Sequence, residues 1–347
     1  MGALELGRWK KIILVGISLI FLLILVGPFL IPVPALENTH PPREVAYPSS
    51  QFVEVNGVDI HYRQFGQGSP VIVLLHGFGA STFSWREVMQ PLSEVGTVLA
   101  FDRPAFGLTE RPLEWEGRNP YSPHSQVEMM VGLLRELDVD QGVVLVGNSA
   151  GGTIAMQTAL DHPDLIRGLV LVDAAVYSGG GSPAWVRPLL HTPQMNRVGV
   201  LLARSIADRG EDFLRSAYHD PSRVTDDVLQ GYRRSLRVDD WDRALWELTK
   251  ASYPLNLDQK TAQVEVPTLV ITGDDDRIVP TEDSVRLAQD IPGAQLAVLA
   301  DCGHLPQEEC PGAFLKVLIP FVEQLPRTYF PGLVSHSHKE RSVVGRQ

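Results

Sequence analysis

The stretch Val143-Val-Leu-Val-Gly-Asn-Ser-Ala-Gly-Gly152 joins an uninterrupted apolar run to a serine that stands between glycines. The apolar run predicts a strand buried on both faces, and the residues after Ser149 predict a helix. Glycines beside the serine permit a tight turn in which a Cβ would collide with the backbone. G-x-S-x-G in this strand–turn–helix context indicates a nucleophilic serine at the top of a sheet. The alternative is a serine that only caps a helix beside packing glycines.

Buried-strand patterns alternate with helical patterns over much of the chain. This alternation predicts a mostly parallel sheet with helices on both faces. Residues 52–62 alternate apolar and polar side chains about Asn56-Gly57, which predicts a β-hairpin that adds antiparallel strands at one edge. The other predicted strands are residues 71–75, 97–101, 168–172, 268–272 and 294–299. The predicted helices are residues 85–94, 125–137, 149–161, 281–289 and 309–324.

The alternation stops between about Tyr177 and Gln263. This stretch has no buried-strand run, and its apolar residues recur at helical spacings. We therefore expect a helical cap at residues 178–262, inserted over the ends of the strands. The core of the fold then comprises residues 51–177 and 263–326, and residues 327–347 form a polar, flexible tail.

The first residues of the chain differ in composition from the rest. Ile12 to Ile31 is a run of twenty residues without a charge, preceded by Arg8, Lys10 and Lys11. As a helix it spans roughly 30 Å, the thickness of the hydrocarbon core of a bilayer. By the positive-inside rule, residues 1–34 are expected to anchor the protein with its main domain on the extracytoplasmic side.

Two other interpretations of this run stay open. Val33-Pro34-Ala35 loosely resembles a cleavage site, so the run is alternatively a signal peptide and the mature protein is secreted. A buried core helix is disfavoured because the run is apolar on every face. The prolines of residues 35–50 predict an extended, semi-rigid spacer that holds the main domain away from the membrane surface.

Composition excludes several classes of protein. The chain has 347 residues, of which 44% are hydrophobic and 20% charged, so wholesale disorder is excluded. Its 41 acidic and 30 basic residues give a net charge of −11 without a basic block, and no nucleic-acid partner is expected. Its two cysteines, Cys302 and Cys310, are too few for a disulfide framework and match no zinc motif.

A second motif, His76-Gly-Phe-Gly79, directly follows a predicted strand. A glycine-rich turn at this place can direct backbone N–H groups into a site. We expect the N–H groups of Phe78 and Ala150 to form a two-donor oxyanion hole. An ordinary strand-to-helix loop with glycines for turn geometry is the alternative.

A third pair of motifs lies near the C-terminal end. Gly273-Asp-Asp-Asp276 follows one predicted strand, and Cys302-Gly-His304 follows another. A serine hydroxyl is too weakly acidic to attack unaided, so it needs a base whose tautomer is fixed by a carboxylate. The order Ser149, Asp276, His304 is the order expected for this type of serine turn.

Together the motifs resemble the α/β-hydrolase superfamily, in its capped serine-hydrolase branch. The resemblance covers roughly residues 52–325 and implies an α/β-hydrolase fold. It implies that Ser149 is the nucleophile, Asp276 the acid and His304 the base. Asp276 is preferred over its neighbours Asp274 and Asp275 because the family's acid usually stands four residues before a proline, and Asp173 is a less suitable substitute. The segments that carry the resemblance are residues 71–79, 101–107, 146–152, 273–280 and 303–304.

At some positions this chain differs from particular branches of the family, and these differences narrow the range of reactions that we expect. Epoxide hydrolases and haloalkane dehalogenases have an aspartate where this chain has Ser149, and prolyl aminopeptidases differ from its His76-Gly-Phe-Gly-Ala80 loop. The resemblance implies a carboxylesterase or lipase-like enzyme that acts on an apolar ester through an acyl-enzyme, without a metal or other cofactor. A carbon–carbon bond hydrolase and a cofactor-free haloperoxidase share the triad and stay open. A non-catalytic binding protein is a further alternative.

The two cysteines flank His304 at a spacing of eight residues. They can pair if the domain faces an oxidising compartment. Two small, unpaired, buried residues are the simpler interpretation, and we favour it.

Overall fold

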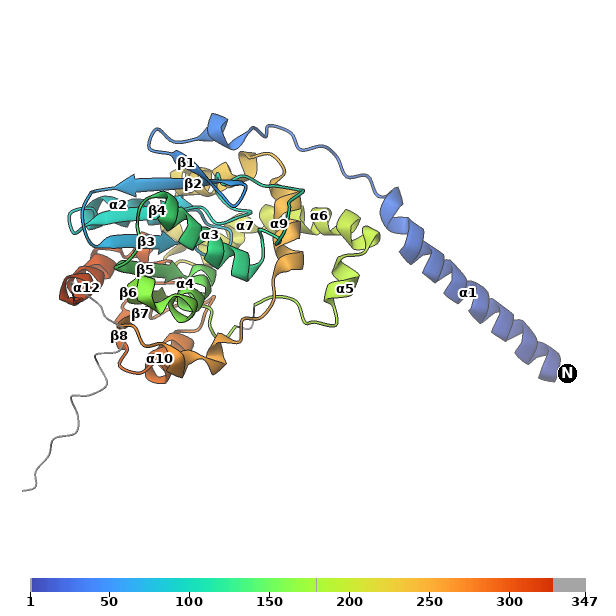
Figure 1. Cartoon of the computed structure of the whole chain (residues 1–347). Helices are drawn as coiled ribbons and strands as arrows, with labels where there is room; N and C mark the ends of the chain where they lie inside the picture. Colours follow the sequence, from blue (N-terminus) through green and yellow to red (C-terminus); the bar gives the residue numbers. More distant parts are fainter. Residues whose placement is uncertain (1, 179, 327–347) are drawn as a thin grey trace, which may run out of the picture.

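A computed structural model of the chain describes residues 2–178 and 180–326. Its centre is an eight-stranded sheet in the order β1-β2-β4-β3-β5-β6-β7-β8 (Figure 1). The hairpin of β1 (Gln51–Val55) and β2 (Val58–Phe65) is antiparallel and lies at one edge, as predicted. The remaining strands are mutually parallel and confirm the predicted sheet. They are β3 (Val71–Leu75), β4 (Thr97–Phe101), β5 (Val143–Asn148), β6 (Ile166–Val172), β7 (Thr268–Gly273) and β8 (Gln295–Leu299).

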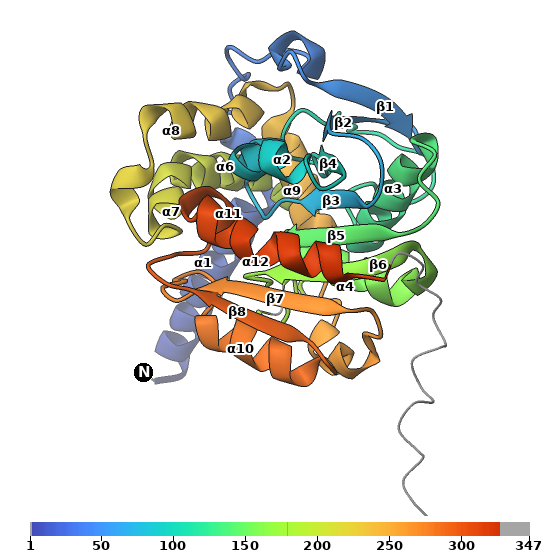
Figure 2. The same ribbon diagram turned by 90° about the vertical axis from the view of Figure 1, so that its left-hand side faces the viewer.

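Two helical layers cover the sheet, which explains why its central strands are apolar runs rather than alternating patterns. Side chains of β3 alternate between the layers, because successive residues of a strand point to opposite faces. Ile72 and Leu74 pack with α2 and α12, whereas Val73 and Leu75 pack with α3 and α4. Figure 2 shows α12 in front of the sheet. These helices are α2 (Arg86–Leu92), α3 (Pro123–Glu136), α4 (Ala150–Asp161), α10 (Thr281–Asp290) and α12 (Pro311–Gln324).

The helix predicted at residues 309–324 is divided in the structure. A short helix, α11 (Pro306–Glu309), precedes α12, and Cys310 between them has φ −125° and ψ 47°. Pro311 accounts for the break, because a proline disfavours helical geometry in the residue before it. The division turns the chain sharply just after His304, and this turn shapes the candidate site.

Between β6 and β7 the chain forms a set of helices, which we call the inserted helices. Figure 1 shows α6, α7 and α9 beyond one end of the sheet. The expectation of a separate cap domain at residues 178–262 stays a prediction. They are α5 (Arg187–Leu190), α6 (Pro193–Asp208), α7 (Gly210–Ser216), α8 (Asp226–Arg233) and α9 (Trp241–Ala251). Short 3₁₀ turns lie at Pro42–Val45, Thr82–Trp85, Pro163–Leu165, Pro221–Arg223, Arg234–Arg237, Leu257–Gln259 and Thr261–Gln263.

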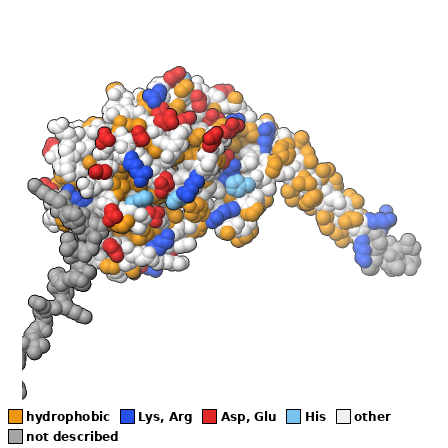
Figure 3. All heavy atoms as spheres, in the orientation of Figure 1, with side chains coloured by type: hydrophobic (Ala, Val, Ile, Leu, Met, Phe, Trp, Pro, Cys, Tyr) orange, Lys and Arg blue, Asp and Glu red, His pale blue; other side chains and the backbone are white. Residues whose placement is uncertain are grey.

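The N-terminal helix α1 (Gly2–Leu30) projects away from the domain as an apolar arm (Figures 1 and 3). Its segment Arg8–Leu30 is long and apolar enough to cross a membrane, and none of it is buried against the domain. A signal sequence near an N-terminus has the same properties, so the helix is present but its role is not determined by length and composition. The tail predicted at residues 327–347 lies outside the described residues.

The proline-rich segment after α1 runs along the inserted helices and does not extend freely away from them. Arg197 donates to the carbonyl of Ile31 and Arg204 to that of Pro34, at 3.0 and 2.9 Å. The His40 N–H donates to the Arg237 carbonyl at 2.9 Å. An extended chain leaves its carbonyls free to accept these bonds. The expected spacer therefore draws the end of α1 toward the domain.

Candidate active site

Ser149 occupies a strained turn between β5 and α4. Its backbone has φ 54° and ψ −121°, a conformation that residues other than glycine rarely adopt. A Cβ at Gly151 would lie 2.2 Å from the Leu75 carbonyl oxygen, and one at Gly147 would lie 2.6 Å from the Gly151 oxygen. Only glycine fits at either position, so the turn can be this tight, and Ser149 lines a cavity above the sheet.

The structure brings His304 and Asp276 together. His304 Nδ1 lies 2.7 Å from Asp276 Oδ2, and both residues are buried. The other carboxylate oxygen of Asp276 accepts the N–H groups of Ile278 at 2.8 Å and Val279 at 3.0 Å, which fixes its orientation. A neutral imidazole that donates Nδ1–H to this carboxylate directs Nε2 away from it as a proton acceptor.

Asn148 joins the loop that contains His304 to the turn at Ser149. We call residues 300–305, between β8 and α11, the histidine loop. The side-chain Nδ2 of Asn148 donates to the carbonyl of His304 at 3.1 Å and to that of Val172 at 3.3 Å. Ser149 and His304 line the same cavity. His304 thus contacts Asp276 and shares a cavity with Ser149, while the catalytic roles of the three residues stay predictions.

The predicted oxyanion groups adjoin the serine. A Cβ at Gly77 would lie 3.1 Å from the Cβ of Ser149, so the loop after β3 passes directly beside it. Phe78 lines the same cavity. Ala150 is the first residue of α4, where N–H groups have no intrahelical partner. This arrangement allows the predicted pair of donors, whose role stays a prediction.

His76 holds the shape of this loop from below. Its Nδ1 donates to the Gly77 carbonyl at 2.8 Å, and its Nε2 accepts the N–H of Arg103 at 3.0 Å. The ring is completely buried, and Phe106 packs edge-on against it. Burial, together with the charge of Arg103, lowers the pKa of His76 to about 3. The imidazole is therefore neutral in the folded protein, with its two nitrogens in fixed donor and acceptor roles.

This neutral histidine predicts a specific loss of stability in acid. Between pH 6.5 and about pH 3, His76 is protonated in the unfolded chain and neutral in the folded protein. The free energy of unfolding then falls by about 1.4 kcal/mol for each pH unit. From pH 7 to pH 5, the wild type should lose about 2 kcal/mol more than His76→Asn. Urea unfolding in detergent at both pH values measures this; equal losses in the two proteins would contradict it.

Asp173, the substitute acid considered above, is also close to Asp276. It is completely buried, and its Oδ1 accepts the Thr272 hydroxyl at 2.7 Å and the Gly273 N–H at 3.2 Å. Burial and then the neighbouring Asp276 charge raise the pKa of Asp173 well above its usual range. A raised pKa makes a carboxyl less suited to stabilise an imidazolium ion. His304 contacts Asp276, and this geometry favours Asp276 as the acid.

Glu308 is a buried carboxylate that the sequence did not single out. Its oxygens accept hydrogen bonds from Ser84 at 2.6 Å and Tyr218 at 3.0 Å, and also from Tyr232 and Arg86. These partners lie after β3 and on the inserted helices. A buried charge is tolerated when it is paired and fully hydrogen-bonded, as here. Glu308 thus joins the inserted helices to the segment that follows His304.

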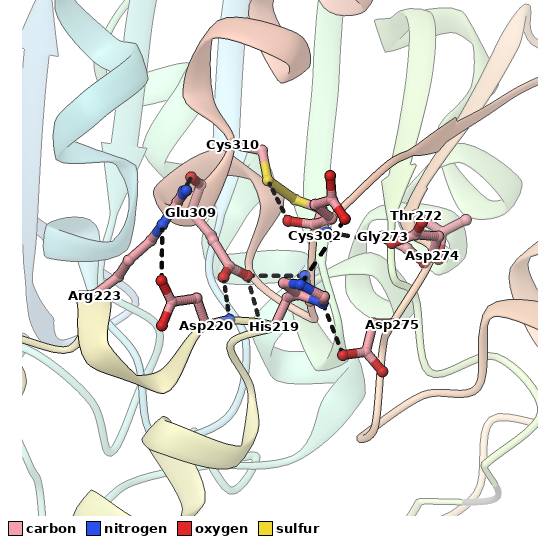
Figure 4. Close-up of a disulfide and its surroundings, with 12 residues drawn as sticks. His219, Asp220, Arg223, Thr272, Gly273, Asp274, Asp275, Cys302, Glu309 and Cys310 are labelled. Carbon is pink, nitrogen blue, oxygen red and sulfur yellow. Dashed lines mark hydrogen bonds and ion pairs between the residues drawn. A yellow bond between two sulfur atoms is a disulfide. The ribbon is translucent and has the colours of Figure 1, made fainter.

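Glu309 makes a second junction of the same kind (Figure 4). It accepts the backbone N–H groups of His219 at 2.9 Å, Asp220 at 2.8 Å and Gly303 at 2.8 Å. One carboxylate therefore fixes both the residue before His304 and a loop of the inserted helices. Glu308 and Glu309 could have been suspected from sequence only as two adjacent acids next to a buried loop.

Cys302 and Cys310 form a disulfide around the histidine loop (Figure 4). Their Cα atoms are 6.2 Å apart. The interpretation that we favoured from sequence, two unpaired buried cysteines, was wrong. Cys310 lies in the sharp turn between α11 and α12, which brings it next to Cys302.

The cavity at the site has a volume of about 710 Å³. That volume is in the range of small-molecule sites. Its walls are mostly apolar and come from both the core and the inserted helices. The apolar and aromatic residues of the lining are Phe78, Ala80, Ala105, Phe106, Ile206, Ala207, Phe213, Leu214, Ala217, Leu229, Tyr232, Leu236, Trp241, Leu245 and Leu305.

The chain belongs to the α/β-hydrolase family: the family described as "alpha/beta hydrolase fold" matches residues 70–311. It is therefore a hydrolase of this family. A 2-hydroxy-6-oxo-2,4-heptadienoate hydrolase of Pseudomonas putida is 32% identical over 290 residues, which are 78% of this chain and 95% of that protein.

Two solved structures give the same picture of the fold. A meta-cleavage product hydrolase from Pseudomonas fluorescens IP01 has a TM-score of 0.60 and 27% identity, over 79% of this chain and 97% of that one. An enzyme described as degrading N-acyl homoserine lactones has a TM-score of 0.59 and 27% identity, over 78% of this chain and 100% of that one. The relatives thus include hydrolases of different bonds.

Proposed function

We propose that this hydrolase cleaves a carboxylic ester of a neutral, apolar substrate through an acyl-enzyme intermediate. The observation that carries the proposal is the apolar cavity of about 710 Å³ that contains Ser149 and His304 in its walls. Such a cavity gains affinity from each buried methylene of an acyl chain or alcohol. The hydrogen bond between His304 and Asp276 supports nucleophilic catalysis by the serine.

The chemistry would proceed in two half-reactions. His304 Nε2 takes the proton of the Ser149 hydroxyl as its oxygen attacks the acyl carbon, and Asp276 stabilises the resulting imidazolium ion. The N–H groups of Phe78 and Ala150 hold the oxyanion, each contributing roughly 3 kcal/mol. His304 then protonates the leaving alcohol, whose bond to the acyl carbon breaks. Water, deprotonated by the same histidine, releases the acid and restores Ser149.

Carbon–carbon bond cleavage is the second candidate, because the heptadienoate hydrolase is 32% identical to this chain. The name of that substrate identifies it as a carboxylate. A cavity that binds a carboxylate is expected to contain a positively charged side chain to pair with it. Two arginines, Arg209 and Arg233, line the cavity of this chain, and Arg233 is already paired with Glu211 at 2.9 Å. The lining also includes the carboxylates of Asp208 and Asp212. With more acidic than basic groups there, a neutral ester is favoured over an anionic substrate.

A series of p-nitrophenyl esters tests the proposal. We expect kcat/KM to rise at least about tenfold from acetate to hexanoate, since each buried CH₂ is worth about 0.8 kcal/mol. The Ser149→Ala variant supplies the background rate. A fluorophosphonate probe should label the wild type, whereas a binding protein with an unactivated serine should not react. Faster turnover of 2-hydroxy-6-oxo-2,4-heptadienoate than of every ester would favour carbon–carbon cleavage instead.

We further propose that α1 anchors the enzyme in a membrane with the hydrolase domain on the extracytoplasmic side. Arg8, Lys10 and Lys11 precede the apolar run, which supports this orientation by the positive-inside rule. The disulfide between Cys302 and Cys310 supports it independently, because disulfides persist mainly in oxidising compartments. A cleaved signal peptide, which leads to secretion, is the alternative.

A further inference from the structure

The segment that forms α5 and most of α6 differs in charge from the rest of the protein. Between Asp173 and Asp208 the sequence has three arginines, Arg187, Arg197 and Arg204, and not one Asp or Glu. The whole chain, by contrast, has a net charge of −11. Apolar helices that carry Arg or Lys and lack acidic residues are typical of surfaces that contact phospholipid headgroups.

Exposed apolar side chains are concentrated on these two helices and in the residues next to them. Outside α1 and Ile31, nine large apolar side chains are exposed in the described part of the chain, and five of them lie between residues 185 and 213. Trp185 is 82% exposed, Leu189 56% and Leu202 48%. Such a grouping marks a contact surface. Tryptophan in particular is enriched at the membrane–water interface. The five residues are Trp185, Leu189, Leu202, Ile206 and Phe213.

The end of α1 lies beside this surface. Gln194 of α6 donates to the carbonyl of Leu25 at 3.2 Å, and Arg197 donates to that of Ile31 at 3.0 Å. Figure 1 shows α5 and α6 as the elements nearest to the C-terminal end of α1. If α1 crosses a bilayer, its last turn lies at the bilayer surface. Leu25 lies more than one turn before the end of α1 at Leu30, so the first turn of α6 must then lie at this surface or slightly below it.

The surface also leads to the cavity. Ile206, near the end of α6, and Phe213, on α7, are both exposed and both line the cavity of Ser149. They therefore mark an opening of the cavity at the end of α6 and on α7, beyond the part of α6 that contacts the end of α1. An apolar molecule that leaves the bilayer at α6 would enter past Ile206 and Phe213.

We propose that the exposed face of α5 and α6 rests on the membrane that α1 spans, and that substrate enters the cavity from the lipid phase past the end of α6. This inference rests on the proposed anchor and deepens the proposed function by naming a lipid-dissolved ester as the substrate. The short connection from α1 to the domain, held by Arg197 and Arg204, keeps this face at the bilayer.

Fluorescence quenching in vesicles tests the contact directly. The only cysteines, Cys302 and Cys310, are paired, so one introduced cysteine can be labelled selectively with an environment-sensitive fluorophore. The full-length protein is reconstituted in phosphatidylcholine–phosphatidylglycerol vesicles that contain doxyl-labelled lipid. Leu202→Cys probes the proposed surface, and Ile20→Cys probes α1. Val298→Cys is the matched control, because Val298 is 46% exposed, close to the 48% of Leu202.

We expect the lipid quencher to reduce fluorescence strongly at positions 20 and 202, and not at position 298. Figure 2 shows β8, which contains Val298, on the opposite side of the domain from α1. Quenching at position 20 without quenching at 202 would overturn the contact surface and leave the anchor intact. Absence of quenching at position 20 would contradict the anchor itself, and the inference would fall with it.

An activity measurement tests the route of entry. The double variant Leu189→Glu, Leu202→Glu places charges on the proposed surface without touching the cavity. We expect about a tenfold or greater loss of kcat/KM for a long-chain ester dissolved in vesicles, from the cost of charges at the membrane. The rate on a short, water-soluble ester should not change. The control Leu296→Glu, Val298→Glu should affect neither rate. Equal losses for both substrates, or no loss for either, would overturn the proposed route.

Discussion

Ser149→Ala leaves essentially no ester turnover, with kcat reduced by roughly 10⁴- to 10⁶-fold. The hydroxyl is the only group at this turn that can attack an acyl carbon, while the turn itself depends on Gly147 and Gly151 and on the buried strand before them. The fold is therefore expected to persist without it. The measurement is kcat on the best ester of the series, with purified protein and active-site titration of the wild type.

The control is a variant that alters the neighbourhood but keeps the nucleophile. Thr153→Ala removes a hydroxyl from α4 that bonds only to the Ala150 carbonyl, at 2.8 Å, and it should retain near-normal turnover. Thermal unfolding of both variants should resemble that of the wild type. If Ser149→Ala kept more than about a thousandth of the activity, the assignment of the nucleophile would be wrong.

Asp276→Asn is expected to lower kcat by about 10⁴-fold. An asparagine in this position can turn its NH₂ group toward His304 Nδ1, which stabilises the wrong tautomer and leaves Nε2 protonated. The backbone N–H groups of Ile278 and Val279 still find an oxygen acceptor, so the loop should keep its shape. The kcat for an ester, measured against pH, checks the result, since no pH should restore the rate.

Three nearby acids serve as matched controls. Burial and the neighbouring Asp276 raise the pKa of Asp173, and its hydrogen bonds are to Thr272 and Gly273, so Asp173→Asn should cost less than about tenfold in kcat. Asp274 accepts the Cys302 N–H, and Asp275 pairs with Arg277 and His219; neither contacts His304, and their Asn variants should cost little. If Asp173→Asn were as damaging as Asp276→Asn, the acid would have been assigned to the wrong strand.

The sheet was predictable because its strands are short, continuous apolar runs. A buried parallel strand must be apolar on both faces, and residues 71–75 and 97–101 carry that pattern over their full length. The place of Ser149 was predictable for a similar reason. Its flanking glycines reflect contacts of 2.2 and 2.6 Å that no Cβ can occupy, and this requirement is visible in sequence.

The supports of the histidine loop were not predictable in the same way. Apart from the Gly303 N–H, the groups that bond to the carboxylates of Glu308 and Glu309 are 76 to 224 positions away in sequence, and no local pattern records which partners will meet there. The disulfide was not favoured because a spacing of eight residues does not show how the chain turns between Cys302 and Cys310. The raised pKa of Asp173 depends on the arrangement of β6 beside β7, which brings two acids together from separate strands.

The bonds of Glu308 and Glu309 divide the inserted helices into a fixed and a variable part. Residues 217–232 cannot swing outward without separating Tyr218 and Tyr232 from a buried carboxylate, and the His304 N–H from the Ala217 carbonyl. The wall at residues 206–213 has no such bond to the histidine loop among the described contacts. For protein engineering, this wall is where the acyl preference can be redesigned, by insertion or exchange of residues, while the catalytic geometry is left undisturbed.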